Sequence, residues 1–194
     1  VLPTRPVRVN LVMPETATLG VSQKIGEQFT LNAGVEWTNW SRLTFPRVID
    51  QVTGQPYAAA PVLNLDYRDG WFFSIGGEYA IDPQWTVRAG FGYEISPVRT
   101  EVRTTRLPDN NRIWTTLGVS YKWNEKLTLD LAYAHLFSGD TPIRYVAGNP
   151  SANPLLPMVA NADNSVNIVS AALRYRWDDP AKPLPAAMPI VRKP

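Results

Sequence analysis

Apolar and polar side chains alternate strictly over residues 71–95, on either side of a short turn at Asp82-Pro83-Gln84. Large apolar side chains form one alternate row, and the other row is polar and rich in glycine. Because successive side chains of a β-strand point to opposite faces, this pattern predicts a hairpin with one apolar and one polar face. Each arm has about eleven residues, which at roughly 3.3 Å per residue and a tilt near 45° span about 25 Å, the height of the apolar band of an outer-membrane barrel.

The same alternation recurs along the chain and predicts seven strands, at residues 16–24, 29–43, 71–81, 85–95, 112–123, 127–137 and 166–177. All eighteen prolines lie outside these segments, as expected of strands that donate hydrogen bonds on both sides. The connections at 25–28, 82–84 and 124–126 are short, whereas those at 44–70, 96–111 and 138–165 are long. Short turns at one rim and long loops at the other are typical of outer-membrane barrels.

We therefore predict an all-β fold, an antiparallel transmembrane β-barrel of which this chain supplies about seven up-and-down strands within residues 16–177. Residues 1–15 show a weaker alternation and are predicted to be an extracellular loop segment. Residues 178–194 contain five prolines and are predicted to form a Pro-rich C-terminal tail.

The tryptophans favour a membrane barrel over a soluble β-sandwich, which would show the same alternation. All seven lie near the ends of the predicted strands: Trp37, Trp40, Trp71 and Trp114 toward the long loops, and Trp85, Trp123 and Trp177 toward the short turns. Indole rings prefer the boundary between membrane and water, whereas a sandwich core would place some large rings in mid-strand. We therefore predict that the protein lies in the outer membrane of a Gram-negative bacterium.

Composition narrows the classes of function further. The formal net charge of the 194 residues is only +2, with Lys and Arg spread along the chain, so nucleic-acid binding is not indicated. The absence of Cys excludes disulfides and thiolate chemistry, and no apolar run is long enough for a transmembrane helix. The chain opens at Val1 without a starting Met, which suggests processing or a fragment.

The polar row is predicted to face the lumen, and its charged members are the candidate lumen-lining residues. They are Lys24, Glu36, Glu78, Arg88, Glu94, Lys122, Asp130, Arg174 and Arg176. Charges of both signs on neighbouring strands predict ion pairs across the ladder. Such pairs commonly brace a lumen or are simply solvated, and the sharper interpretation is a pathway in which Arg and Lys meet an acidic head group.

Two further candidates lie at the corner where the predicted strand at 112–123 begins. Asp109 and Arg112 are predicted to form a local ion pair that fixes the entry to the strand, with contact to an extracellular ligand as the alternative. The single histidine, His135, falls on the apolar row and is predicted to be an interfacial residue, since no second His or Cys completes a metal site. We predict no enzymatic activity, no catalytic or metal-binding residues and no cofactor.

Several segments, in order, resemble the C-terminal half of the FadL-type long-chain fatty acid transporters. They include Met13-Pro-Glu-Thr-Ala-Thr-Leu-Gly-Val21, Val35-Glu-Trp-Thr-Asn-Trp-Ser41, Asp69-Gly-Trp71, Trp85 to Pro97, and Leu107-Pro-Asp-Asn-Asn-Arg-Ile-Trp114. The resemblance implies a fourteen-stranded barrel, plugged by an N-terminal hatch, that passes hydrophobic molecules sideways into the bilayer. The hatch and the first half of that barrel have no counterpart here, so they are expected as a missing partner of this chain.

The resemblance thus implies passive uptake of long-chain fatty acids or similar hydrophobic molecules, with outer-membrane lipids around the wall. Uptake of aromatic hydrocarbons by the same architecture is one alternative. A structural or adhesion barrel whose loop at 138–165 binds a partner is another, and a soluble lipid-binding barrel is a third.

Overall fold

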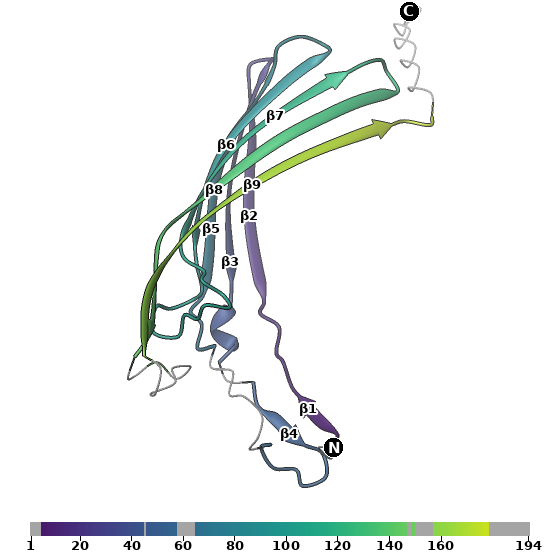
Figure 1. The fold of residues 1–194 in the computed structure, drawn as a ribbon. Helices are drawn as coiled ribbons and strands as arrows, with labels where there is room; N and C mark the ends of the chain where they lie inside the picture. The colour runs from purple at the N-terminus through teal and green to yellow at the C-terminus, as the bar shows by residue number, and fades with distance from the viewer. Residues whose placement is uncertain (1–4, 45, 58–64, 147–148, 150–156, 179–194) are drawn as a thin grey trace, which may run out of the picture.

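Seven strands form one antiparallel sheet in chain order, which confirms the predicted up-and-down topology. The computed structural model describes residues 5–44, 46–57, 65–146, 149 and 157–178, and the predicted tail beyond residue 178 lies outside them. Figure 1 shows the sheet as a curved, open arc. Its strands are β2 (Thr16–Ile25), β3 (Phe29–Thr38), β5 (Gly70–Ala80), β6 (Trp85–Ile95), β7 (Arg112–Lys122), β8 (Leu127–Tyr145) and β9 (Met158–Tyr175).

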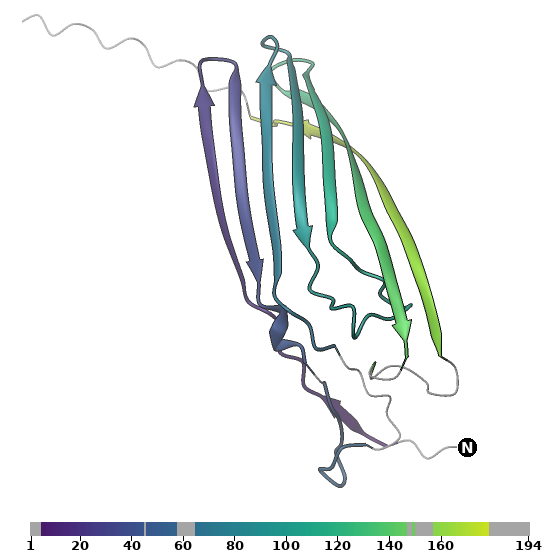
Figure 2. The same ribbon diagram turned by 90° about the vertical axis from the view of Figure 1, so that its left-hand side faces the viewer.

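A small second sheet lies beyond the long-loop end of β2 and β3. There β1 (Val7–Val9) pairs antiparallel with β4 (Val48–Asp50), and Figure 2 shows the pair standing apart from the main sheet. Arg5 donates to Asp50 at 2.9 Å, and the same carboxylate accepts from the backbone N–H of Val52 at 2.8 Å. These hydrogen bonds lower the pKa of Asp50 and stabilise the turn that follows β4.

Two of the short turns are fixed by side chains that accept backbone hydrogen bonds. Asp82 accepts from the N–H groups of Gln84 and Trp85, both at 2.7 Å. Asn124 does the same for Lys126 and Leu127, both at 2.8 Å. Because Asp and Asn stabilise tight turns in this way, these positions set where each hairpin reverses.

Strand β3 ends at Thr38, five residues before the predicted end, and a 3-10 turn, η1 (Trp40–Arg42), follows it. Asp69 explains the difference, because its carboxylate accepts from the indole of Trp37 at 2.9 Å and from the backbone N–H of Ser41 at 3.3 Å. The chain is thereby drawn out of the strand, so alternation beyond Thr38 does not continue as a ladder.

The long connection predicted at 138–165 is largely a β-ribbon instead of an irregular loop. Strand β8 continues to Tyr145 and β9 begins at Met158, with a register shift between Ser138 and Thr141. Pro142 therefore lies inside a strand, contrary to the rule drawn from the sequence. Its carbonyl accepts a hydrogen bond from Arg103, so the position joins the ribbon to the loop beside it.

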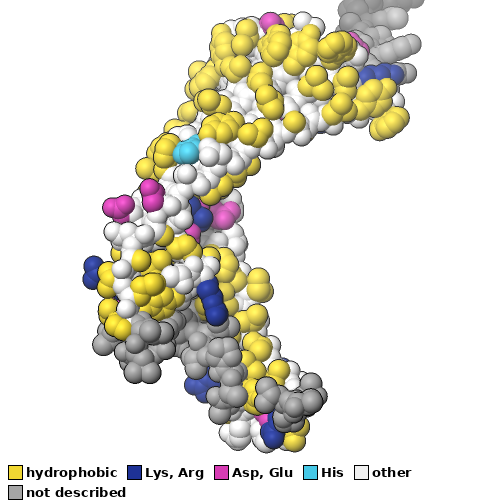
Figure 3. All heavy atoms as spheres, in the orientation of Figure 1, with side chains coloured by type: hydrophobic (Ala, Val, Ile, Leu, Met, Phe, Trp, Pro, Cys, Tyr) yellow, Lys and Arg dark blue, Asp and Glu magenta, His cyan; other side chains and the backbone are white. Residues whose placement is uncertain are grey.

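The two faces of the sheet differ as the alternation predicts. Large apolar side chains of one row, such as Leu117, Leu131 and Leu173, are 53–65% exposed. Figure 3 shows apolar side chains along the convex edge, with the single histidine among them. No helix in the described part of the chain is long and apolar enough to cross a membrane.

The buried core of the described residues gathers at the long-loop rim, outside the apolar faces. Val98 and Val102, in the connection between β6 and β7, are 3% and 6% exposed, and Ile143 of β8 is 4% exposed. Arg103 is buried beside them and donates to the carbonyls of Asp109 at 2.8 Å and Pro142 at 3.0 Å. Residues 96–111 and the β8–β9 ribbon thus form one packed unit above the sheet.

Candidate lumen-lining face

The concave face of the sheet carries the second, polar row of side chains. Its register rows run from strand to strand, for example Gly20, Gly34, Ser74, Gly92, Trp114, Leu136 and Val166. All nine candidate lumen-lining residues belong to this alternate row of side chains. Eight of them lie within the paired strands, and Arg176 directly follows β9. Four features lie on this face between the short turns and the long loops.

The first feature is the short-turn ladder, which joins Glu78, Arg88, Ser120, Asp130 and Arg174 across five strands. Arg88 donates to Glu78 and to Ser120, each at 2.5 Å. The hydroxyl of Ser120 donates to Asp130, which also accepts from Arg174 at 2.8 and 3.2 Å. The cross-strand ion pairs predicted from the sequence are therefore present.

The second feature is an aromatic hollow over glycine, between β3 and β7. The ring of Phe72 lies over Gly92, where an added Cβ would approach it to 2.8 Å, and it meets Trp114 edge to face at 5.9 Å between centroids. Gly76 and Gly90 form the floor of this open hollow of about 310 Å³. Glycine at position 92 thus makes room for the ring.

The third feature is an apolar groove of about 220 Å³ on the same face of β7, β8 and β9. Small side chains shape it, because Gly118 pairs with Ala132 and Ala132 pairs with Ser170. Ala134 and Ile168 extend it toward the long loops, and Arg88 lines its border with the short-turn ladder. The groove therefore presents an apolar surface that ends at charged groups.

The fourth feature is the long-loop network around Arg112. Arg112 lies between two carboxylates, Glu94 at 2.5 Å and Asp109 at 3.2 Å, which confirms the local ion pair predicted for Asp109 and Arg112. Glu94 also accepts from the indole of Trp114 at 3.0 Å, and Asp109 accepts from Ser96 at 2.5 Å. The positive charge of Arg112 is thus compensated from two sides.

The remaining candidates are more isolated. Glu36 accepts from Thr18 at 3.3 Å. In the described part of the chain, no carboxylate lies within ion-pair distance of Lys24, Lys122 or Arg176. These three cations lie at the short-turn ends of their strands, so that rim of the concave face is richer in cations than in carboxylates.

Sequence reasoning missed Ser120, Phe72 and Trp114 as members of this face. Ser120 is only 5% exposed and joins two ion pairs, a role that the alternation alone does not reveal. Trp114 was grouped with the interfacial tryptophans, but its register with Gly92 places it on the concave face. Its position near a strand end therefore did not indicate an interfacial residue.

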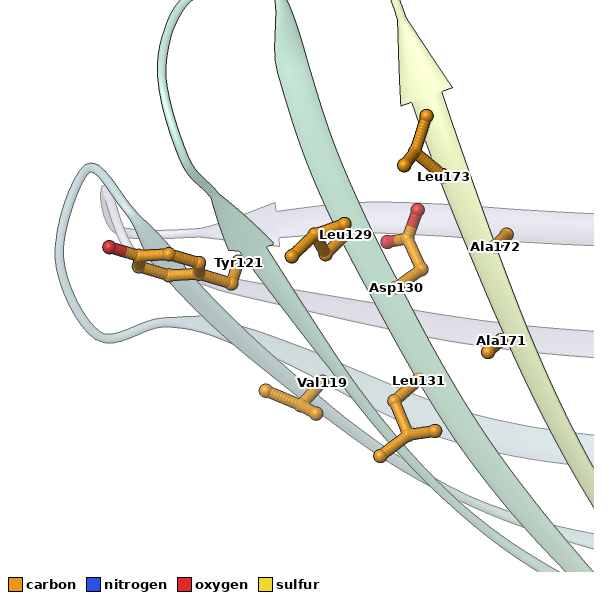
Figure 4. A pocket seen from close by; sticks show the side chains of 8 residues that line it. All are labelled: Val119, Tyr121, Leu129, Asp130, Leu131, Ala171, Ala172 and Leu173. Carbon is orange, nitrogen blue, oxygen red and sulfur yellow. The ribbon is translucent and has the colours of Figure 1, made fainter.

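The convex face carries a hollow of its own, of about 370 Å³, between β7, β8 and β9. Figure 4 shows the side chains that line it, among them Val119, Leu131 and Ala171. They form one register row, and the small side chain of Ala171 leaves the space. An apolar depression on this face fits an acyl chain of the surrounding membrane.

His135 lies on the convex face, as predicted from its place in the apolar row of the sequence. Its Nδ1 lies 2.7 Å from Oδ1 of Asn167, which also accepts from the hydroxyl of Tyr133 at 2.7 Å, and its ring contacts Phe137. Within the described residues, no group of three or more His, Asp or Glu side chains could hold a metal ion.

An antiparallel up-and-down sheet with an apolar convex face and a polar concave face defines the wall of an outer-membrane β-barrel. The family described as outer membrane protein transport protein (OMPP1/FadL/TodX) matches residues 3–177. The chain belongs to this family, and with it to the outer membrane of Gram-negative bacteria.

Similar proteins agree with this assignment. The putative outer membrane protein NMB0088 of Neisseria meningitidis is 32% identical over 143 residues, covering 71% of this chain and 30% of the relative. A long-chain fatty acid transport protein of Escherichia coli is 24% identical over 130 residues, or 66% and 28% of the two chains. The chain thus spans about three tenths of these curated relatives.

Solved structures show the same fold. The crystal structure of a Pseudomonas aeruginosa FadL homologue matches with a TM-score of 0.70 and 25% identity, covering 84% of this chain and 35% of that one. A deltaS2 mutant of the TodX monoaromatic hydrocarbon channel matches with a TM-score of 0.61 and 20% identity, covering 88% and 38%.

Proposed function

We propose that the whole protein is a channel for passive uptake of long-chain fatty acids or similar hydrophobic molecules across the outer membrane. The concave face of this sheet would line its lumen, and the protein would catalyse no reaction. The observation that carries the proposal is the apolar groove on the concave face, which is bounded by charged groups at its short-turn end. Relatives named as long-chain fatty acid transport proteins support it.

The arrangement suggests how a passenger would move. A hydrophobic molecule captured at the long-loop rim leaves water and lies against the aromatic hollow and the apolar groove. Burying apolar surface stabilises it by roughly 25 cal/mol per Å² removed from water.

Uptake of aromatic hydrocarbons is the second candidate, and one observation favours it. The edge-to-face pair of Phe72 and Trp114 stands over a glycine floor, a geometry that suits a flat ring as well as an acyl chain.

One experiment separates the candidates. Uptake of a labelled long-chain fatty acid and of a labelled alkylbenzene is measured in cells that produce or lack the full-length protein. Fatty-acid uptake that depends on the protein supports the first candidate, and alkylbenzene uptake alone supports the second. If the barrel is folded in the membrane and neither compound enters faster, the transport proposal is wrong and the adhesion alternative takes its place.

A further inference from the structure

The short-turn end of the apolar groove is a place where the concave face carries a positive charge that no carboxylate of the described residues compensates. In the short-turn ladder, Glu78 pairs with Arg88 at 2.5 Å and Asp130 pairs with Arg174 at 2.8 Å, so both of its carboxylates are already engaged. Lys122 lies on the same face in the register row of Arg174, through Thr128. Within these strands, three cations thus face two carboxylates, and Lys122 is the one that no carboxylate of the described residues pairs.

The geometry connects this charge to the groove. Along β7, the concave positions from the groove onward are Thr116, Gly118, Ser120 and Lys122, so the strand runs from the groove through the short-turn ladder to the lysine. Gly118 and Lys122 are four residues apart, or about 13 Å at roughly 3.3 Å per residue. A molecule with an apolar tail in the groove would place a polar head near Lys122.

The cation that the strands place at the long-loop end of the face, Arg112, lacks this property. Arg112 lies between Glu94 and Asp109, so an incoming carboxylate there would meet two negative charges already in place. The exposed Lys122 has no such partner in the described part of the chain.

We propose that Lys122 receives the carboxylate head of an amphipathic passenger whose tail lies in the groove formed by Gly118, Ala132 and Ala134. The inference rests on the proposed uptake function and adds a direction to it, with the head toward the short-turn rim. It also makes Lys122 a residue that selects carboxylates over neutral molecules of equal length. Charge complementarity of this kind determines specificity more than total affinity.

The test compares a long-chain fatty acid with its methyl ester, which has the same tail without the charge. Protein-dependent uptake of both is measured in cells producing the full-length protein with Lys122→Glu or Lys122→Gln. Lys24→Glu is the matched control, because Lys24 is a rim cation of the same face on β2, away from the groove. Heat-modifiable migration on a gel gives the amount of folded barrel, and Lys122→Gln serves if the reversed charge impairs folding.

We expect Lys122→Glu to lower uptake of the acid about five- to tenfold, the effect of losing one charged contact, while ester uptake is unchanged. Lys122→Gln should have a smaller effect in the same direction, and Lys24→Glu should have none. Equal loss of acid and ester, equal loss in the Lys24 control, or no loss at all would overturn the assignment of Lys122. In each of those outcomes the wild-type protein still takes up both compounds; if it takes up neither, the proposed function itself is wrong.

Discussion

Ser120 joins the two ion pairs of the short-turn ladder through a single hydroxyl. It is 5% exposed, accepts from Arg88 and donates to Asp130. We predict that Ser120→Ala lowers the free energy of unfolding by about 1–3 kcal/mol, because two charged partners lose a buried hydrogen bond. Urea unfolding of the refolded full-length protein in micelles measures this. Ser22→Ala, at an exposed position of the same face on β2, is the control, and an equal loss there would contradict the role of Ser120.

Asp69 gives the long-loop rim a dependence on pH. Hydrogen bonds from Ser41 and from the indole of Trp37 lower the pKa of its carboxyl below the usual 3.8. A carboxyl whose pKa is lower in the folded state stabilises the fold above its unfolded pKa, and this contribution is lost as the pH falls through the folded pKa. The window is therefore below about pH 4.

We predict that lowering the pH from 5 to 3 reduces the thermal midpoint of the wild-type protein more than that of Asp69→Asn. Thermal unfolding of the full-length protein, followed by tryptophan fluorescence, measures the difference. Asp163→Asn, at an exposed position of β9 without a partner among the described residues, should behave like the wild type. An equal response of wild type and Asp69→Asn would show that Asp69 is not responsible.

The sequence predicted which residues share a face, but not which of them bind one another. Alternation alone assigned Glu78, Arg88 and Asp130 to the polar row. Ser120 escaped notice because a serine in a polar row looks like any solvated position, and only the strand register reveals its two charged partners. The face to which a side chain points follows from its own strand, whereas the side chains that it contacts depend on pairing between segments that are distant in the chain.

At the scale of elements, residues 96–111 and the β8–β9 ribbon form one packed unit. Arg103 holds them together through carbonyls on both sides. We predict that Arg103→Met leaves these carbonyls unpaired and lowers the local opening free energy of the unit by about 1–3 kcal/mol. Hydrogen exchange of the amides in residues 96–111 measures it. Arg106→Met, at an exposed position in the same loop, is the control; if both variants exchange alike, Arg103 does not hold the unit.

Element boundaries were predictable where local chemistry sets them and not where tertiary contacts do. Asp82 and Asn124 mark their turns in the sequence, and β5, β6 and β7 begin and end within a residue of the predicted limits. The end of β3 was missed because it depends on Asp69, which is distant in the chain. The extension of β8 past Pro142 was missed because the loop at 96–111 supports it.

At the scale of the molecule, the described chain is one curved wall with two kinds of surface. The convex face is mostly apolar, and the concave face carries charged groups toward both ends with an apolar groove between them. Ala132 and Leu131 are neighbours on β8 that point to opposite faces, so they distinguish the two surfaces with the least change in position.

The most direct test of the account is protein-dependent uptake of a labelled long-chain fatty acid in cells producing full-length Ala132→Trp or Leu131→Trp, at equal amounts of folded barrel. A large ring at position 132 fills the groove, whereas at position 131 it meets lipid. We predict that Ala132→Trp reduces uptake severalfold and that Leu131→Trp leaves it at the wild-type rate. Equal uptake by the two variants, or loss only in Leu131→Trp, would contradict the claim that the concave face is the path.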